Sequence, residues 1–463
     1  MNFLRVKRLH FVGIGGIGMS GLAELLASVG LTVTGSDVRE SDNTARLRAA
    51  GIPVFASGHR AEHVSGADVV VYSSAVDEAN PEVAAARAAG IPVIKRAEML
   101  AEVMRFTRGI AIAGSHGKTT TTSLTGAVLL EAGLDPTIIV GGRFRADGTN
   151  ARLGKGEFLV AEADEYDKSF LRLRPVLAVV TNIDLEHLDT YRDLADLKAA
   201  FSEFAGTVPF FGAALLGLDD PNVQEIRPLL SSRVRVTTFG LTPQADVTAR
   251  DLSLDRTGCR FTAVADGRPL GPVEVSLPGL HNVKNALAAI AVARELEVPF
   301  AVTARALSSF AGVVRRFERK GERAGVLVVD DYAHHPTEVS ATLAAARQAH
   351  PERRLVALFQ PHLYTRTRDQ AEAFGAAFLA ADALYVLPVY PSREAPIPGV
   401  TSRLVSDAAR ARGHRHVVDL DVRSEVVPRL LEELGPGDLL VTMGAGDVLH
   451  LGEELLRAGG EAP

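Results

Sequence analysis

One stretch, Ala113 to Thr122, constrains the fold and the chemistry of this chain more than any other. It reads Ala-Gly-Ser-His-Gly-Lys-Thr-Thr-Thr-Thr. The apolar run 109–113 before it predicts a buried strand, and the segment 123–133 after it has the apolar spacing of a helix that ends at a glycine. A glycine-containing turn between a strand and a helix N-terminus gathers free backbone N–H groups at the positive end of the helix dipole, so it binds anions.

The side chains of this stretch suit a nucleoside triphosphate. Lys118 offers a flexible cation to the outer phosphates, and Thr119 or Thr120 offers a hydroxyl to Mg²⁺. The generic phosphate-loop pattern has a glycine where this chain has Ile112, so a threonine-rich helix cap is the alternative interpretation. We expect the phosphates to contact Gly114, Ser115, His116, Gly117, Lys118, Thr119 and Thr120.

A second glycine-rich turn, 13–18, follows the predicted strand 9–12 and opens a helix. An acid, Asp37, comes about 20 residues later, after a further strand. This pattern predicts a diphosphate at the helix N-terminus, which an NAD cofactor and a UDP-sugar would both satisfy. Asp37 either takes a ribose hydroxyl or caps a turn. The candidate diphosphate contacts are Gly15, Gly16, Ile17, Gly18 and Met19, with Ser73 and Ser74 at the end of the strand 68–72.

Acidic and histidine side chains follow two predicted strands in the middle of the chain. Glu162 lies in the acidic end of the strand 157–165, where an acid beside a phosphate loop commonly anchors Mg²⁺. His187 follows the strand 176–180 and could be a metal ligand, a phosphate donor or a helix cap.

Short alternating runs follow, and 234–238 and 271–277 are expected to form small antiparallel strands. An alanine-rich helix comes next, and Asn282 and Asn285 share one side of its first turn. Neutral amides there suit an adenine ring or a metal-bound water; the alternative is that one asparagine is an N-cap and the other lies on the surface.

Polar clusters also follow the predicted strands of the last third, 326–329, 355–359, 384–387 and 439–443. The ends of parallel strands are the functional edge of an open α/β sheet. The clusters include Asp331, Tyr332, His334, His335, His362 and Arg366.

Composition narrows the class of protein. The chain has 463 residues, 47% of them hydrophobic and 23% charged, which is typical of a globular protein with two or three domains. No apolar run reaches the ~20 residues of a membrane span. Cys259 is the single cysteine, which fits a reducing cytoplasm, and a net charge of −6 disfavours nucleic acid as a partner.

The motifs follow one another in a fixed order along essentially the whole chain, and that order resembles the Mur ligase family, which joins amino acids to UDP-muramyl precursors. The resemblance implies an α/β fold of three domains. Residues 1–106 would form a Rossmann-like UDP-binding domain. Residues 107–311 would form a central ATPase domain of the P-loop type with extra antiparallel strands, and 312–463 a Rossmann-like domain with the amino-acid site.

The resemblance also implies roles for individual residues. Thr119, Glu162 and His187 would ligate magnesium, and Asn282, Asn285, Arg316 and Asp331 would contact ATP. Tyr332, His334, His335, His362 and Arg366 would shape the amino-acid site. The implied catalytic set is Lys118, Glu162, His187, Arg316 and His334. Leu363 stands where the family usually has arginine, so Arg366 is expected to replace that contact.

The implied reaction is the ATP-dependent addition of L-alanine to the lactyl carboxylate of UDP-N-acetylmuramate through an acyl phosphate, with two magnesium ions, in a cytoplasmic monomer or weak homodimer. Three alternatives stay open. One is a ligase that attaches a whole peptide to the same UDP-sugar during wall recycling. The others are an NAD-dependent oxidoreductase and a non-catalytic nucleotide sensor.

Overall fold

The computed structural model describes residues 3–73, 75–141, 151–186, 190–392 and 394–458. The chain divides into two compact units. The first comprises 1–250, 262–273 and 284–310, and the second comprises 251–261, 274–283 and 311–463. In the described ranges no helix is long and apolar enough to cross a membrane.

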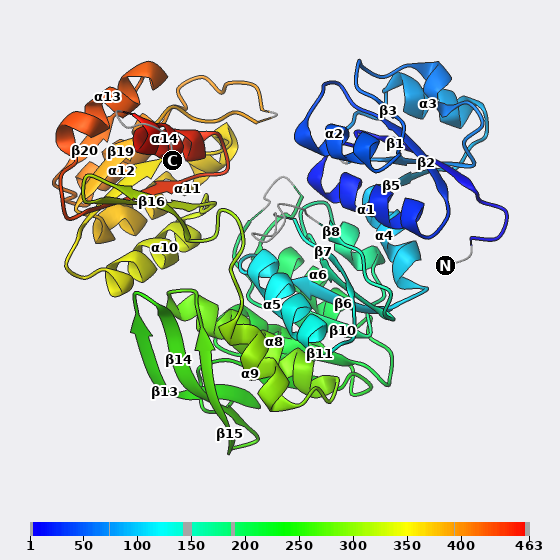
Figure 1. The fold of residues 1–463 in the computed structure, drawn as a ribbon, viewed down its shortest axis with the longest axis horizontal. Helices are drawn as coiled ribbons and strands as arrows, with labels where there is room; N and C mark the ends of the chain where they lie inside the picture. Colours follow the sequence, from blue (N-terminus) through cyan, green and yellow to red (C-terminus); the bar gives the residue numbers. More distant parts are fainter. Residues whose placement is uncertain (1–2, 74, 142–150, 187–189, 393, 459–463) are drawn as a thin grey trace. The chain divides into compact units, whose positions relative to one another are not determined.

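The N-terminal sheet has five parallel strands in the order β3-β2-β1-β4-β5 (Figure 1). Helix α3 starts at Pro81 because the Asn80 side chain accepts the N–H of Glu82. Side chains of α1, α2 and α4 cover one face of the sheet, and those of α3 and η1 cover the other. The bounds are β1 (Arg8–Val12), α1 (Ile17–Ser28), β2 (Thr32–Ser36), α2 (Asp42–Ala49), β3 (Val54–Phe55), η1 (Ala61–Val64), β4 (Val69–Tyr72), α3 (Pro81–Ala88), β5 (Val93–Lys95) and α4 (Arg96–Met104).

The central sheet has ten strands in the order β15-β14-β13-β12-β11-β10-β6-β9-β7-β8. Its strands are β6 (Arg108–Ala113), β7 (Thr137–Ile139), β8 (Ala151–Arg152), β9 (Phe158–Glu162), β10 (Leu177–Val180), β11 (Ala213–Gly217), β12 (Val236–Phe239), β13 (Val247–Asp255), β14 (Gly258–Ala265) and β15 (Arg268–Val275). Its helices are α5 (Lys118–Glu131), η2 (Ser169–Arg172), α6 (Leu194–Ala205), α7 (Pro221–Ile226), η3 (Arg227–Leu229), α8 (Leu280–Glu295) and α9 (Phe300–Ser308). One hydrophobic cluster contains side chains of both this sheet and the N-terminal one, which explains why the two lie in a single unit.

The expectation of an antiparallel strand at 234–238 was wrong. Strand β12 pairs with β11 in parallel, with Leu215 opposite Thr237. In the sequence, helix α7 comes between β11 and β12. The connection through it returns the chain to the end of the sheet where β11 began, as parallel neighbours require. By contrast, two-residue turns at 256–257 and 266–267 join β13, β14 and β15, as antiparallel neighbours require.

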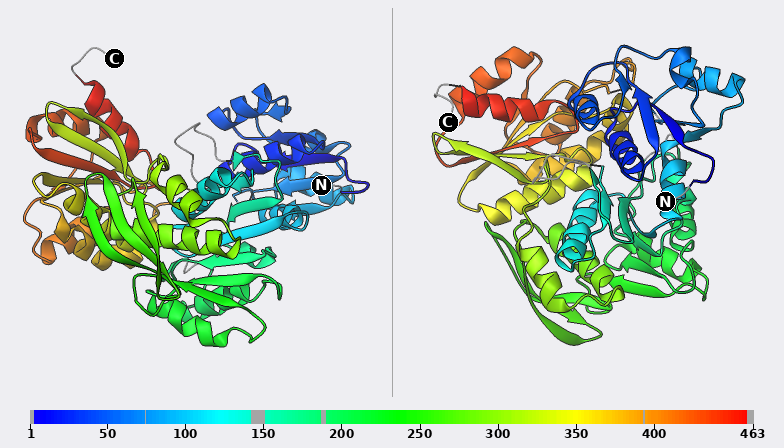
Figure 2. Two further views of the ribbon diagram at one scale, coloured as in Figure 1. Left: turned by 60° about the horizontal axis from the view of Figure 1, so that its bottom comes forward. Right: turned by 45° about the vertical axis from the view of Figure 1, so that its right-hand side comes forward.

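The C-terminal sheet has six strands in the order β16-β17-β21-β18-β19-β20, parallel except for β16. Helices α10, α11 and α12 pack on one face, and α13 and α14 pack on the other (Figures 1 and 2, yellow to red). The strands are β16 (Glu318–Arg323), β17 (Val326–Asp331), β18 (Arg354–Phe359), β19 (Ala383–Val386), β20 (Val417–Asp419) and β21 (Asp438–Met443). The helices are α10 (Pro336–Ala349), α11 (Tyr364–Ala377), η4 (Phe378–Ala380), α12 (Arg403–Ala411), α13 (Arg423–Glu433) and α14 (Val448–Arg457).

The predicted α/β fold class is confirmed, with one sheet for each expected domain. The sequence did not indicate β16 or β20, whose residues are only partly buried and carry no clear apolar run. Helix α5 also begins earlier than expected, at Lys118, because Gly117 directly before it adopts the left-handed conformation that ends the loop.

Candidate active site

The loop between β6 and α5 requires glycine at two positions. Gly114 has φ +132° and Gly117 has φ +83°, a region that side chains rarely adopt. A Cβ at Gly114 would clash with the hydroxyl of Thr181, and one at Gly117 would lie 2.5 Å from Asn285 Oδ1. The loop therefore needs glycines for close approach as well as for backbone shape.

The segment after β10 holds this loop in place. Thr181 Oγ1 and Asn182 Nδ2 both donate to the carbonyl of His116, at 2.6 and 3.0 Å, and Asn182 Oδ1 accepts the His116 N–H at 2.9 Å. Ser115 Oγ accepts the N–H of Asp184 at 2.8 Å and donates to its carbonyl at 3.1 Å. Thr181 and Asn182 thus fix the backbone of the loop.

Lys118 is surrounded by carboxylates. Its Nζ lies 2.7 Å from the Gly114 carbonyl and 2.7 and 2.9 Å from the two carboxylate oxygens of Glu165. Burial alone would lower the pKa of Lys118, but Glu165, Asp164 and Glu186 outweigh it and raise that pKa. Burial raises the pKa of Glu165 to about 7, against the attraction of Lys118 and with repulsion from Asp164. The three carboxylates carry more negative charge than the single positive charge of Lys118 balances. Their oxygens therefore fit a hard divalent cation such as Mg²⁺.

The predicted magnesium anchor Glu162 ends β9, and its Oε1 accepts the N–H of Gly141 at 2.7 Å. The acid that contacts Lys118 is Glu165, which the sequence interpretation did not single out. Only its place in an acidic run after a strand could have indicated it. Thr119 and Thr120 are buried in the first turn of α5, and Asn285 Oδ1 accepts the hydroxyl of Thr121 at 3.2 Å. His187 and Ser74 lie outside the described residues.

The two consecutive arginines after α9 have different environments. Arg315 has φ +60°, and its Nε donates to Asp330 Oδ2 at 3.0 Å. The Arg316 guanidinium lies 5.4 Å from the ring centre of Tyr332 and 3.8 Å from Glu338, with 28% of its side chain exposed. Burial raises the pKa of Asp331 to about 6, although Arg316 opposes the shift. The carboxylate of Asp331 accepts the N–H groups of Phe317 and Ala333 at 2.7 and 2.8 Å, so it shapes the backbone here.

The predicted amino-acid residues form a continuous series of contacts in the second unit. Tyr332 meets the ring of His334 at 5.2 Å, and His334 meets His362 at 5.7 Å. Arg366 donates to His362 Nδ1 at 3.4 Å, and Tyr390 stacks on His362 at 6.0 Å. Tyr390 was not among the predicted site residues, and only its place after a strand, beside Pro391, indicates it in the sequence.

The other predicted residues of the second unit have structural contacts. His335 is buried and forms the N-cap of α10, where Nδ1 accepts the Thr337 N–H at 3.4 Å. Leu363, with φ +70°, precedes α11 and donates its N–H to the Tyr390 carbonyl at 3.0 Å. Asn282 Nδ2 donates to the Pro278 carbonyl at 2.8 Å at the start of α8.

The N-terminal glycine-rich turn is held by Asp37. Asp37 Oδ2 accepts the Gly15 N–H at 2.8 Å, and Oδ1 accepts the N–H of Val38 at 2.8 Å. Asn43 Nδ2 donates to the Gly15 carbonyl at 2.8 Å. Met19 is buried beneath the turn, and a Cβ at Gly13 would lie 3.3 Å from that of Ser73. The structure therefore gives Asp37 a role in fixing the turn.

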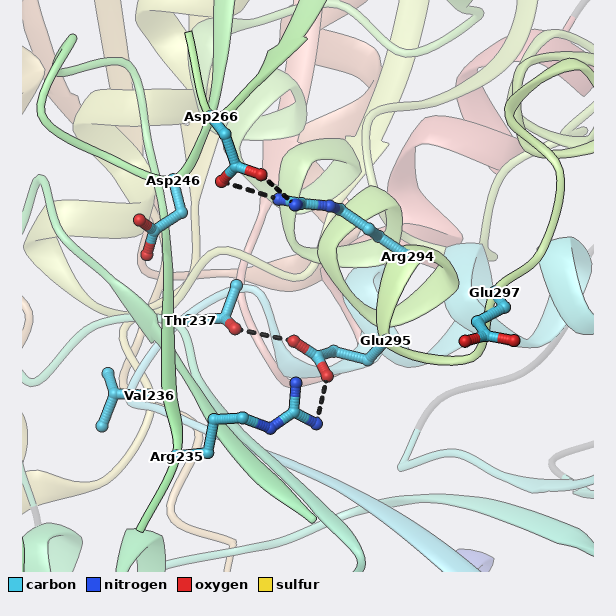
Figure 3. A pocket seen from close by; sticks show the side chains of 8 residues that line it. All are labelled: Arg235, Val236, Thr237, Asp246, Asp266, Arg294, Glu295 and Glu297. Atoms are coloured by element: carbon cyan, nitrogen blue, oxygen red, sulfur yellow. Dashed lines mark hydrogen bonds and ion pairs between the residues drawn. The ribbon is translucent and has the colours of Figure 1, made fainter. Parts of the chain in front are cut away.

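A polar cleft of about 490 Å³ lies elsewhere in the first unit, between β12 and the end of α8 (Figure 3). Its arginines are paired, Arg235 with Glu295 at 2.5 Å and Arg294 with Asp266. None of the predicted site residues lines it.

Comparison with known proteins covers most of the chain. Residues 8–108 match the model described as Mur ligase family, catalytic domain. Residues 112–293 match the Mur ligase middle domain, and 315–446 match the Mur ligase glutamate ligase domain.

The chain belongs to the Mur ligase family.

Individual Mur ligases are similar over nearly the whole length. The UDP-N-acetylmuramate–L-alanine ligase of Desulfatibacillum aliphaticivorans is 52% identical over 450 residues, which are 97% of this chain and 98% of that one. A crystal structure of the UDP-N-acetylmuramate-alanine ligase of Thermotoga maritima superposes with a TM-score of 0.81 at 29% identity, covering 98% of this chain and 99% of that one. A murein peptide ligase from Psychrobacter arcticus gives a TM-score of 0.72 at 25% identity, covering 99% of both.

Proposed function

We propose that this Mur ligase uses ATP to join L-alanine to the lactyl carboxylate of UDP-N-acetylmuramate, releasing ADP and phosphate, in peptidoglycan precursor synthesis. The observation that carries the proposal is 52% identity over 97% of the chain to a ligase of that name. The murein peptide ligase is a weaker match, which favours alanine over a whole peptide as the amine substrate. An NAD-dependent oxidoreductase would leave the loop around Lys118 without a role.

The proposed chemistry explains why a largely buried cation lies at this loop. A carboxylate does not react with an amine at neutral pH because oxide is a poor leaving group, whereas an acyl phosphate carries a good one. Forming it brings two anions together, so Lys118 in the first turn of α5 would screen their repulsion and stabilise the transferring phosphoryl group. We propose Arg316 as a second cation on the ATP phosphates. Its partly exposed guanidinium suits this role better than that of Arg315, which Asp330 holds.

Magnesium, when bound, would neutralise phosphate charge and polarise the transferring group. We propose Thr119, Glu162 and His187 as its ligands, with two ions in all. Asp164, Glu165 and Glu186 add the negative charge that favours a divalent cation near Lys118. We propose Asn285, which lies beside Gly117, and Asn282 as contacts of the nucleotide. Asp331 would support nucleotide binding by holding the backbone next to Arg316.

The amino-acid site is proposed at the cluster of Tyr332, His334, His362 and Arg366, because its cation and imidazoles can take the carboxylate and the amine proton of alanine. His335 would act by starting α10. ATP and UDP-sugars are made in the cytoplasm, where we place the reaction, and a monomer or weak homodimer remains a prediction.

Phosphate release from ATP tests the proposed function. The purified protein is given Mg²⁺, UDP-N-acetylmuramate and a panel of L-alanine, glycine, L-serine and the tripeptide L-alanyl-γ-D-glutamyl-diaminopimelate. We expect the highest kcat/KM with L-alanine and no release without the UDP-sugar. Preference for the tripeptide would assign the recycling reaction instead, and ADP formation that ignores every amine would contradict both.

A further inference from the structure

The guanidinium of Arg96 lies against Gly18 in the first turn of α1. A Cβ added at Gly18 would lie 3.1 Å from Cδ, 3.2 Å from Nε and 3.3 Å from Cζ of Arg96. Gly18 has no positive φ, so the backbone conformation does not require glycine there. The missing side chain instead leaves the space in which the arginine of α4 lies against α1, two helices that run side by side (Figure 1).

Arg96 has no hydrogen-bond or ion-pair partner among the residues that the structure describes, unlike Arg46 and Arg87 of the same domain. Arg46 pairs with Glu24 at 2.9 Å, and Arg87 pairs with Glu78 at 3.2 Å. Arg96 as a whole is half-buried.

A backbone donor lies at the same place as the guanidinium of Arg96. The Gly15 N–H is taken by Asp37, and the Gly16 N–H by the carbonyl of Gly13. The N–H of Gly18 has no acceptor within the described ranges, as expected in the first turn of a helix. One free amide and one guanidinium therefore lie together at the start of α1.

The sheet order brings these groups together. Arg96 follows β5 directly, as Gly13 follows β1, and all strands of this sheet are parallel. Both residues consequently lie at the carboxyl edge of the sheet, where the strand order reverses between β1 and β4 and open α/β sheets bind their ligands. The distance along the chain between Gly18 and Arg96 hides this relationship in the sequence.

We infer that Arg96 binds the diphosphate of the UDP-sugar, an inference that rests on the proposed function. Its planar fork can reach two phosphate oxygens at once, while the amide of Gly18 takes another. Gly18 acts as a positioning residue, because any larger side chain would displace the guanidinium.

Calorimetric titration of Arg96→Gln with UDP-N-acetylmuramate, UDP and ATP tests the contact. We expect the dissociation constants of UDP-N-acetylmuramate and UDP to rise about 10- to 100-fold, with that of ATP unchanged. KM for the UDP-sugar should rise while kcat at saturation stays near wild type. Arg96→Lys keeps the charge and should lose less. Arg87→Gln is the matched control, an exposed arginine of the same domain, and should change none of these values.

An unchanged UDP affinity in folded Arg96→Gln, checked by circular dichroism, would overturn the inference. A loss with UDP-N-acetylmuramate alone would also overturn it, because Arg96 would then contact the muramate. Failure of the proposed function is a separate result, namely a wild-type protein that binds neither UDP ligand.

Gly18→Ala tests the positioning. Its Cβ should move the guanidinium and weaken UDP binding in the wild-type background, but it should add little to Arg96→Gln. If the two losses multiply in the double variant, Gly18 does not act through Arg96.

Discussion

Lys118 Nζ contacts both carboxylate oxygens of Glu165, at 2.7 and 2.9 Å, although the two residues lie far apart in the chain. Glu165 is almost fully buried, and Asp164 and Glu186 act on the same cation. Lys118 is therefore the charge that compensates the acidic cluster around the buried Glu165 and also the cation proposed to meet the phosphates of ATP. Removing the lysine side chain should affect both the acidic cluster and the proposed ATP site.

Lys118→Ala should abolish turnover and leave UDP-sugar binding intact. Loss of a preorganised cation from a phosphoryl-transfer site costs about 10²–10³ in rate or more. Phosphate release and calorimetry with UDP-N-acetylmuramate measure the two effects. Turnover within a few-fold of wild type would refute the assignment of this loop.

Gly117→Ala should lower ATP affinity as well as stability. Its φ is +83°, and the new Cβ would lie 2.5 Å from Asn285 Oδ1, so the loop must move. Gly133→Ala is the matched control, because Gly133 has φ +72° and open space around it, and should cost only the ~1 kcal/mol of left-handed backbone strain. Urea unfolding and ATP titration of both variants separate strain from collision. Equal ATP affinities of Gly117→Ala and Gly133→Ala would contradict the requirement that the loop around Gly117 keep its shape to bind ATP.

Arg316→Lys should keep the ATP dissociation constant near wild type and lower kcat by about 10-fold or more, because lysine cannot bridge two phosphate oxygens. Arg315→Lys should chiefly reduce stability, since Arg315 holds Asp330 and the carbonyls of Gly444 and Gly446. Turnover and thermal unfolding of both variants make the comparison. A wild-type kcat for Arg316→Lys would contradict the proposed phosphate contact and make Arg316 a surface residue without a catalytic role.

Glu82 should make stability depend on acid pH. Its side chain is fully buried, and although burial opposes ionisation, hydrogen bonds from His10, Ser36 and His63 lower its pKa to about 2. Because the folded pKa lies below the unfolded value of 4.5, the contribution of Glu82 is complete above pH 4.5 and is lost as pH falls towards about 2.

Glu82→Gln should therefore lower the free energy of unfolding by about 2–4 kcal/mol at pH 7. The difference in the free energy of unfolding between wild type and Glu82→Gln should be smaller at pH 3. Urea unfolding at both pH values measures it, and a gap that is the same at both would contradict the assigned origin of the shift.

Local patterns predicted much of the fold. Strands such as β1, β6, β17 and β18 were recognisable because buried parallel strands are short apolar runs, and the two glycine turns were recognisable by their spacing. The direction of β12 was not predictable from 234–238 alone, because it depends on the short helix α7 that precedes it. Strands β16 and β20 were missed because their partly buried residues form no clear apolar run.

The sequence by itself determined which chemical groups are present and at which strand ends they lie, because apolar periodicity and glycine placement act over a few residues. Only the tertiary structure decided what each group meets: Lys118 meets Glu165, the N–H of Gly15 meets Asp37, and Arg96 lies against Gly18. Those pairs depend on strand order, on where each strand ends and on how the chain turns afterwards. Such contacts form between residues distant in the chain, and no local pattern records them.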